Sequence, residues 1–468
     1  MPAIITDKIR RSTTENYFNK FTEANDEGLL SSPSDSGKGV WIGIGRSQPW
    51  AGNETGANFI VPYPSSMPFD ERLVRENLSA LVRGSVHYLI PRNRLLEGRR
   101  YKKYDPTDWS CFYPSNAEDG SELLPCYVEF GGHVYLILNN NNGAQKGVGN
   151  PSLSSYGTQT VDGYRYAYVT SVPAGSTFFT NQFIEIPDDN PAGAKSGDQL
   201  GLIFGYRAVS RGTGYTNSDT ATIRGLNLNG TVRPPENVSI TTTTGGQIQS
   251  IALPTSGAPG WLKATVTINS GTGSGAHFVP LIGPAQGFGE NIREHLPAWF
   301  LGVAADFEGK VEGAAKIIPF RQISVILNPE RNPAAESGDS PGLVNARDAM
   351  DALNYFVLNS LPLPNEIPTT GSVITQTSSG ARAYFDRYRE VDSEHRFYFH
   401  NSSFSSNVNI LPFDASGNIS ISNVSYVYTS LSSPEYVHGT GDVLFIENRN
   451  RIDRSVSQTE EVKVVIQY

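Results

Sequence analysis

One short stretch of the chain has the pattern of a hydrolase nucleophile. The residues GDSPG at 338–342 fit G-x-S-x-G, in which a serine sits on a sharp turn between a strand and a helix. Here the preceding apolar strand ends near Leu327, and two prolines separate that strand from Ser340. Pro341 also lacks the backbone N–H that would help to bind an oxyanion. We therefore expect Ser340 to lie in a loop and to have no catalytic role.

A second stretch has the pattern of a phosphate-binding loop. The residues GTGSGA at 271–276 fit a loose G-x-G-x-x-A and follow a strand-like segment. In nucleotide-binding folds such a loop leads into a helix, whose N-terminus faces the phosphate. The residues that follow, HFVPLIG, are typical of another strand. We therefore expect a β-turn here and no bound cofactor.

The histidines and carboxylates do not cluster in the sequence. His395 and His400 lie five residues apart on a strand-like segment, and an odd spacing puts their rings on opposite faces. The acidic pairs 188–189 and 460–461 are adjacent, so their side chains diverge in extended chain. Metal ligands and glycosidase carboxylates must converge on one point. The sequence predicts no metal site, no catalytic residue and no enzyme activity.

The composition is typical of many short strands joined by turns. The chain has 468 residues and is rich in glycine, proline, tyrosine and phenylalanine. It carries 37 basic and 46 acidic residues, and this net charge of −9 argues against nucleic acid or an anionic membrane as a partner. The N-terminus lacks the apolar core of a signal peptide, and no run is long enough for a membrane span. We expect a mainly β protein that is made in the cytoplasm.

Two cysteines, Cys111 and Cys126, lie in a loop-like region. Only two thiols in a chain of this length favour a reducing compartment and free thiols. One local disulfide between them is the alternative that the sequence leaves open.

Hydrophobic periodicity predicts several elements. Alternation over residues 40–44 predicts a strand, and the apolar run 317–330 predicts one that is buried on both faces. Another strand is expected near 298–309, and a short strand followed by a helix within 1–28. Apolar residues at helical spacing predict helices over 69–89 and around 346–356. The residues that carry the last two predictions are Leu73, Leu78, Leu81, Val82, Ala346, Ala349, Met350, Leu353 and Phe356.

The secondary structure expected from the sequence changes twice along the chain, from mixed helix and strand to strands alone and back to mixed helix and strand. Helical periodicity is absent from about 90 to 290, where short strands alternate with turns. Within this region, residues 205–283 are rich in glycine and threonine and read as a module of their own. We therefore expect a main domain of residues 1–89 and 291–468, interrupted by an inserted β-domain of residues 90–290.

The last element expected is a pair of strands, DVLFIENR and EEVKVVIQY, joined by a basic segment. We expect the final strand to join a sheet made by residues 40–45 and 320–327. Arg449, Arg451 and Arg454 lie in the connection before it. Two interpretations of this connection are open. It is either a solvated turn, or its arginines contact an acidic partner or the pair Glu460–Glu461.

Several stretches in order resemble one known family. They are VWIGIGRSQPW (40–50) leading into VPYP (61–64), LIPRNR (89–94), PFRQISVILNP (319–329) and FIENRNRIDRSVSQTEEVKVVIQY (445–468), with VDGYRYAYVTSVPAG and FFTNQFIEIP in the inserted region. Together they resemble the dimeric, gene-eight-type baseplate wedge subunit of T-even-like contractile-tailed bacteriophages, in a cyanophage-like version. The chain is longer than this family, and the excess lies in 205–283 and 371–440.

The resemblance implies a homodimeric structural protein of the virion. It implies a β-sandwich domain interrupted by an inserted β-domain, and contacts to other baseplate wedge proteins that move when the tail contracts. Two other functions stay open. A receptor- or glycan-binding tail protein would fit the aromatic-rich β composition, and a tail-associated hydrolase would need converging carboxylates or a serine–histidine arrangement.

Overall fold

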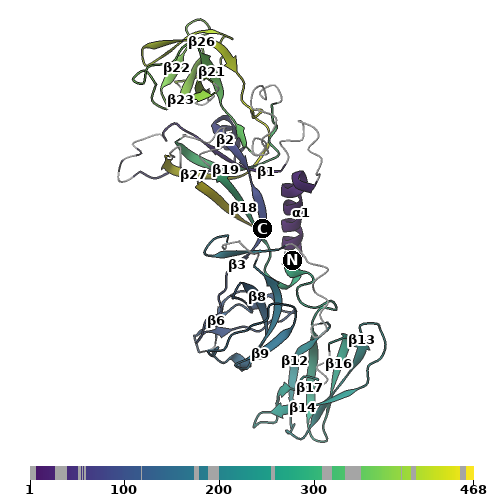
Figure 1. Ribbon diagram of the computed structural model, residues 1–468. Helices are drawn as coiled ribbons and strands as arrows, with labels where there is room; N and C mark the ends of the chain where they lie inside the picture. Colours follow the sequence, from purple (N-terminus) through teal and green to yellow (C-terminus); the bar gives the residue numbers. More distant parts are fainter. Residues whose placement is uncertain are drawn as a thin grey trace. The chain divides into compact units, whose positions relative to one another are not determined.

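Strands dominate the fold, and helices are few (Figure 1). The computed structural model of the chain describes residues 7–26, 39–50, 54, 56, 59–117, 119–172, 179–187, 200–254, 259–307, 319–332, 349–391, 393–401, 407–453 and 460–468. Three α-helices are found within these ranges: α1 (Asp7–Asp26), α2 (Pro68–Glu76) and α3 (Ile292–His295). The expectation of a mainly β fold with few helices is confirmed.

The chain forms two compact units, and each is built from separate stretches of sequence. Unit 1 comprises Met1–Arg11, His87–Phe300 and Gln467–Tyr468. Unit 2 comprises Ser12–Val86 and Leu301–Ile466. The sequence predicted an inserted β-domain of residues 90–290 and a main domain of residues 1–89 and 291–468. The short N-terminal strand expected before α1 lies outside the described residues.

A five-stranded sheet forms one part of unit 2. Its order is β20 (Ala349–Asp351), β2 (Leu78–Arg83), β1 (Val40–Gly45), β19 (Phe320–Leu327) and β27 (Asp442–Ile452). All six residues of β1 are buried, as are all but one of β19, so both strands are covered on their two faces. A Cβ at Gly45 would overlap the backbone of Asn77, which explains why this position is glycine. The strands expected at 40–44 and 317–330 are confirmed.

The helix expected over 69–89 is wrong beyond its first turns. Helix α2 ends at Glu76, where the Asn77 side chain donates to the carbonyl of Leu73 at 2.8 Å. Residues 78–83 then form β2, which pairs antiparallel with β1. The four residues that begin β2 are buried in the sheet, so pairing with β1 overrides the helical spacing of their side chains.

The helix expected around 346–356 is also wrong. Residues 349–351 form β20, in which Met350 pairs with Leu81 of β2, and residues 354–358 form β21 (Asn354–Leu358). Met350 belongs to the core beneath the five-stranded sheet, whereas Phe356 belongs to another core. The apolar spacing that mimics a helix therefore comes from two short strands that serve different cores. Ala346 lies outside the described residues.

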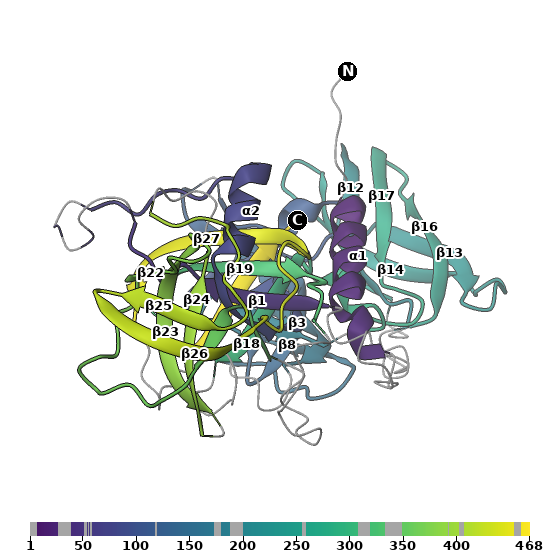
Figure 2. The same cartoon turned by 90° about the horizontal axis from the view of Figure 1, so that it is seen from above.

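The second part of unit 2 is a closed β-barrel (Figures 1 and 2). Its strand order is β21, β24 (Glu394–His400), β23 (Arg382–Val391), β22 (Val373–Thr375), β25 (Gly417–Ile421) and β26 (Val424–Ser432), and β26 pairs back onto β21. Aromatic rings fill its core, with Phe356 stacked on Phe399 at 4.3 Å and Phe413 edge-on to both. The sequence marked this region only as turn-rich, because closure depends on pairings far apart in the chain.

The last strand of the chain joins a different sheet from the one expected. Strand β28 (Glu460–Gln467) lies beside β18 (Phe300–Phe307), which is the strand expected near 298–309. The strand that joins β19 is β27. Since β1 and β27 occupy the two edges of β19, and β2 and β19 those of β1, neither strand has an edge left for β28.

Unit 1 contains several small sheets. The first has the order β7 (Tyr127–Phe130), β8 (His133–Asn140), β10 (Tyr164–Ser171) and β9 (Thr158–Val161), and its core is lined by tyrosines. Beside it are the short strands β4 (Arg100–Tyr101), β6 (Glu122–Leu124) and β5 (Ser115–Asn116), and the 3-10 helices η2 (Trp109–Phe112) and η3 (Asn141–Gly143). Strand β11 (Phe183–Ile186) pairs with residues 88–91 of β3 (Ser85–Pro91).

The Gly-rich stretch of unit 1 has a core of its own. It consists of the pair β12 (Ile203–Thr213) and β17 (Ser274–Ile282), and a sheet of order β15 (Ile248–Ile251), β14 (Glu236–Thr242), β13 (Thr220–Asn227) and β16 (Trp261–Asn269). Trp261 is 1% exposed and packs in this core with isoleucines from β13, β14 and β15. The module expected at 205–283 falls within this part of the chain.

Candidate interface site at the edge strand

The basic residues singled out in the sequence lie on the edge strand of the five-stranded sheet. In β27, Asn448 pairs with Gln322 of β19, and the next paired residues are Ile452 and Phe320. Residues 449–451 therefore stand opposite Arg321 alone. This is a β-bulge, a feature that bends the strand and redirects side chains. The segment Arg449–Arg451 is thus an irregular part of a strand and not a turn.

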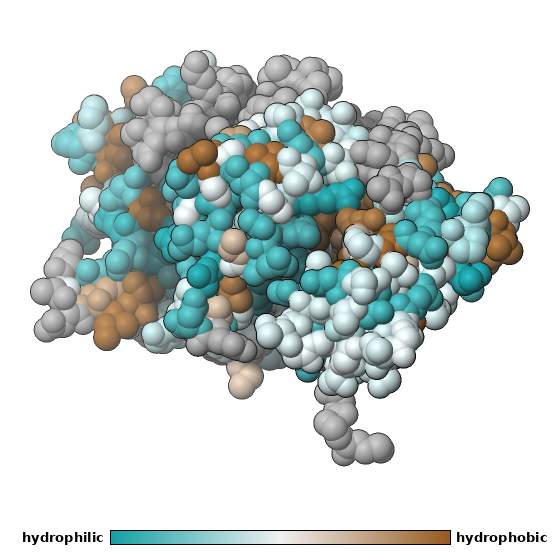
Figure 3. Space-filling view, turned by 90° about the horizontal axis from the view of Figure 1, so that it is seen from below, coloured by the Kyte–Doolittle hydropathy of each residue, from teal (hydrophilic) through white to brown (hydrophobic). Residues whose placement is uncertain are grey.

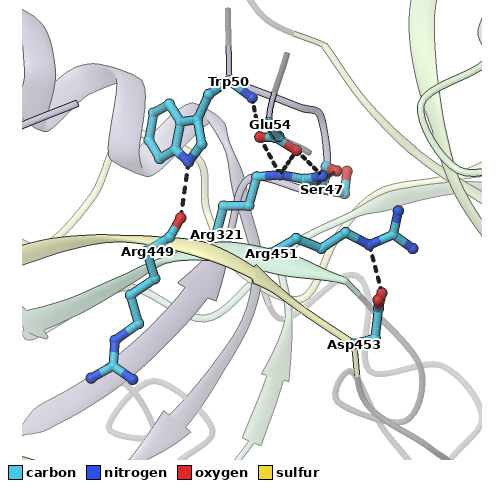
Figure 4. A network of polar contacts seen from close by, with 7 residues as sticks. All are labelled: Ser47, Trp50, Glu54, Arg321, Arg449, Arg451 and Asp453. Carbon is cyan, nitrogen blue, oxygen red and sulfur yellow. Dashed lines mark hydrogen bonds and ion pairs between the residues drawn. The ribbon is translucent and has the colours of Figure 1, made fainter. Parts of the chain in front are cut away.

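Arg321 is the buried centre of the site, and its side chain is 2% exposed. The guanidinium donates to both carboxylate oxygens of Glu54, at 2.7–3.0 Å, and to the backbone carbonyl of Ser47 (Figure 4). A charge this deeply buried is tolerated only when it is paired and hydrogen-bonded. The two-pronged geometry fixes Ser47 and Glu54 against β19.

Trp50 links the same loop to the bulge. Its backbone N–H donates to Glu54, and its indole N–H donates to the carbonyl of Arg449 at 2.9 Å (Figure 4). The Arg46 guanidinium lies over the indole ring, 3.8 Å from the ring centre. Arg46 itself has a positive φ of 59°, which is uncommon for a residue with a side chain. Arg46 and Trp50 therefore hold a specific arrangement that covers the carbonyl of Arg449 on the edge strand.

Electrostatics in this loop follow from burial and from two nearby guanidinium groups. Burial, together with the charge of Arg321, lowers the pKa of Arg46 to about 10, although Glu54 opposes this shift. Burial of Glu54 favours its neutral form, but the hydrogen bonds from Arg321 and from the Trp50 amide outweigh this effect and lower its pKa. At neutral pH the site holds one carboxylate between two cations.

The exposed arginines of the bulge are paired along their own strand. Arg449 contacts Glu447 at 2.9 Å, and Arg451 contacts Asp453 at 2.7 Å. Their side chains are 44% and 55% exposed, and that of Arg449 points away from the Arg321–Glu54 pair (Figure 4). Glu461 contacts Lys463 at 2.9 Å. Arg454 lies outside the described residues.

Charged side chains on an edge strand oppose pairing with another sheet. The row of Glu447, Arg449, Arg451 and Asp453 fits that role and also offers charges of both signs to a partner. Whether the bulge contacts an acidic partner stays a prediction.

An exposed apolar segment adjoins the site and was not singled out as a surface from the sequence. The Asn448 side chain accepts from Gln322 at 2.8 Å and donates to the carbonyl of Pro62 at 2.9 Å. Residues 59–69 around Pro62 include Ile60 and Tyr63, which are 77% and 92% exposed. The signal in the sequence is a run of fifteen residues, 55–69, without a charge and with three prolines.

Of the two sequence patterns considered for catalysis and cofactor binding, one lies outside the described residues and the other leads into a strand. Ser340 and the rest of GDSPG lie outside the described residues. Residues 274–276 of GTGSGA begin strand β17, so the strand expected after this stretch is confirmed. Over the ranges that the structure describes, no group of three histidines, cysteines or carboxylates is placed to hold a metal ion.

His400 and Asp386 form a buried pair between the barrel strands β24 and β23. The Nδ1 atom of His400 is 3.7 Å from the carboxylate of Asp386, which is too long for a hydrogen bond. Arg387 contacts Asp386 at 3.4 Å and Asp351 at 2.5 Å. Burial lowers the pKa of His400 although Asp386 opposes this shift. These groups read as a structural charge cluster and not as a catalytic relay.

No helix in the described part of the chain is long and apolar enough to cross a membrane. A search with models of known protein families gave no match to this chain, and a search of curated proteins gave none either.

Proposed function

We propose that this protein is a structural subunit of the baseplate wedge of a contractile bacteriophage tail. In this proposal it acts as a homodimer in the virion, holds neighbouring wedge proteins and moves with them when the tail contracts. Rigid-body motion against repacking interfaces is a common way for such assemblies to switch. The proposal needs no catalytic residue, metal or cofactor.

The observation that carries the proposal is the meeting of three separate segments at one site. The stretches 40–50, 319–329 and 445–468 are those with the strongest family resemblance. They supply Ser47 and Trp50, then Arg321, and finally Arg449, which are joined by hydrogen bonds across up to 399 positions of sequence. The residues that carry the resemblance therefore support one structural unit.

The chemistry of this site suits a supporting role. The hydrogen bonds of Arg321 go to Glu54 and Ser47 within unit 2, so its charge is neutralised inside the protein. A buried arginine–carboxylate pair held at two points has little freedom to move. The result is a rigid base beneath the edge strand and beneath the exposed segment 59–69.

The surface near this base is suited to contacts with other proteins. Ile60, Tyr63, Met67 and Phe69 are all more than half exposed, and large apolar side chains gathered on one segment are typical of interaction sites. On the face drawn in Figure 3, hydrophobic residues form small patches separated by hydrophilic ones. Small patches of this kind are normal on protein surfaces, so the support for a contact comes from segment 59–69.

Two measurements test the proposal. Light scattering on the purified protein is expected to give twice the 50.9 kDa mass of one chain. Antibodies against the protein are expected to label the baseplate end of contractile tails in electron micrographs. A clean monomer at micromolar concentration would refute the homodimer. Labelling of fibres or capsids, or hydrolysis of cell-envelope polymers by the pure protein, would refute the wedge assignment.

A further inference from the structure

Unit 1 contains two buried thiols in direct contact. The Sγ atoms of Cys111 and Cys126 are 3.2 Å apart, and both cysteines are free. Cys111 is 4% exposed and Cys126 is fully buried. In a protein with only two cysteines in 468 residues, this contact brings together every thiol of the chain.

The backbone holds the two cysteines in register. The amide of Cys126 donates to the carbonyl of Cys111 at 2.9 Å, and the amide of Ile137 on β8 donates to the carbonyl of Cys126 at 2.8 Å. Cys111 lies in η2, which is capped by the Asp108 side chain accepting from the Ser110 amide. The contact between the thiols therefore rests on backbone hydrogen bonds as well as on side-chain orientation.

We infer that Cys111 and Cys126 form a reversible dithiol–disulfide pair that closes the segment between them. Only a short approach of the two sulfurs separates the present contact from a bond. The closed segment would contain β5 and β6, which lie on the connection from η2 to β7. The inference is independent of the proposed function.

The environment distinguishes the two sulfurs chemically. The hydrogen bond from Cys126 lowers the pKa of the Cys111 thiol, whereas burial raises the pKa of the Cys126 thiol. Cys111 also keeps the small exposure that Cys126 lacks. Cys111 is therefore the attacking thiolate and Cys126 the resolving thiol.

Hydrogen peroxide is an oxidant small enough for this site. The Cys111 thiolate attacks one peroxide oxygen, the O–O bond breaks, hydroxide leaves, and Cys111 becomes a sulfenic acid. The Cys126 sulfur then displaces the sulfenic oxygen, which leaves as water with the proton of the Cys126 thiol. Two thiols and one peroxide thus give one disulfide and two waters, and a dithiol reductant reverses the change.

The test uses the full-length protein, reduced and then exposed to hydrogen peroxide. After oxidation, alkylation under denaturing conditions and peptide mapping are expected to find Cys111 and Cys126 joined. The intact mass should fall by two hydrogen atoms, and neither thiol should take up label. The thermal midpoint of unit 1 should rise by about 6–12 °C, because the bond closes a short loop of the unfolded chain.

Single variants give matched controls. Cys126→Ser should leave Cys111 as a sulfenic acid that a dimedone probe traps, and Cys111→Ser should give no trapped product. Two free thiols after prolonged exposure of the wild type, overoxidised Cys111 beside a free Cys126, or a disulfide between two chains would overturn the inference. Because the wild-type peptide map decides among these outcomes, the test does not depend on the variants folding.

Discussion

At the scale of single residues, unit 2 depends on two buried arginines. Arg321 is matched by Glu54, whereas Arg387 lies between Asp351 and Asp386. Each guanidinium is nearly inaccessible to solvent, so removal of either one leaves a carboxylate without its partner. Such losses are costly even where the intact pair contributes little net stability.

Replacement of Arg387 by methionine is expected to lower the free energy of unfolding of unit 2 by about 3–5 kcal/mol. The reason is that Asp386 and Asp351 would lose the cation that contacts both. Chemical denaturation of the two proteins gives the difference. The matched control is Arg382→Met on the exposed part of the same strand, with an expected change within about 0.5 kcal/mol. Equal effects of the two substitutions would contradict the assigned role of Arg387.

Two buried histidines should make unit 2 sensitive to mild acid. Burial lowers the pKa of His400 and of His438, which are near each other, while Asp386 and Arg46 also act on His400. The unfolded chain then binds protons that the folded chain does not bind once pH falls below the ordinary value of 6.5. The free energy of unfolding is therefore not reduced by these histidines above this pH. Below it, the free energy of unfolding falls by up to about 1.4 kcal/mol per pH unit for each histidine.

The measurement is the unfolding free energy of unit 2 between about pH 7 and pH 5.5, above the range in which most carboxylates titrate. The variant His400→Gln is expected to flatten this pH dependence. A pH slope that is unchanged in the variant would show that His400 is not the group responsible.

At the scale of elements, the bulge in β27 explains why an arginine-rich segment lies within a strand. The bulge leaves the carbonyl of Arg449 available to the Trp50 indole, while the side chains of Arg449 and Arg451 stay at the surface. One irregularity thus serves two purposes. It anchors the loop after β1, and it presents charges at the edge of the sheet.

The variant Trp50→Phe should loosen this anchor. It removes one hydrogen bond, which typically contributes about 1 kcal/mol, and keeps an aromatic ring for Arg46 to cover. Hydrogen-exchange mass spectrometry is expected to show faster exchange in residues 447–452 and no change in the barrel. The control is Trp299→Phe, since the Trp299 indole N–H has no hydrogen-bond partner in the described structure. Unchanged exchange in β27 would argue against the anchor.

Reversal of charge at Arg451 tests the exposed row on β27 as a contact site. Exposed ion pairs contribute at most about 1 kcal/mol, so Arg451→Glu should leave folding nearly intact. If an acidic partner docks there, incorporation into wedges should fall about tenfold or more, because like charges would then face each other. Quantitative labelling of assembled particles gives the measurement, with Arg72→Glu on α2 as an exposed control. Normal incorporation of Arg451→Glu would remove this contact from the proposal.

At the scale of the whole molecule, separate cores hold the two units. The barrel and the five-stranded sheet of unit 2 have their own clusters, and unit 1 has a tyrosine-lined core and the Gly-rich module. None of these clusters draws residues from both units. A substitution that destabilises one core should therefore destabilise mainly the unit that contains this core.

The variants Phe356→Ala and Ile137→Ala test this separation. Phe356 is fully buried in the barrel of unit 2, and Ile137 is fully buried in the tyrosine-lined core of unit 1. Each truncation is expected to cost about 2–5 kcal/mol, from lost burial and the cavity left behind. Hydrogen exchange should then rise in unit 2 for the first variant and in unit 1 for the second. Equal rises in both units for either variant would show that they unfold together.

Strands with strong local patterns were predictable from the sequence. The predictions failed where the secondary structure depends on pairing with strands far away in the chain. Alternation and long apolar runs correctly marked β1, β18, β19 and β27. The segments that form β2, β20 and β21 carry apolar residues at helical spacing, but pairing across the chain makes them strands. Barrel closure between β21 and β26 could not be read from local signals for the same reason.

The candidate site was predictable only in part. Arg449 and Arg451 stood out as charges beside a strand, but their bulge depends on register with β19. The Arg321–Glu54 pair was missed because its members are 267 residues apart. The usable signal was an arginine inside an apolar strand, since a charge at such a position needs a partner.

The central position of β1 also has a consequence for synthesis of the chain on the ribosome. Strand β1 ends at residue 45, and its neighbour β19 begins at residue 320, which is 275 residues later. At roughly 5–20 residues per second, β1 waits about 14–55 s for that neighbour. During this time the nascent chain exposes an apolar strand with one open edge, which is the kind of segment that chaperones bind and that aggregates in their absence. Production of soluble protein should therefore depend on chaperone supply during translation more than on the stability of the finished fold.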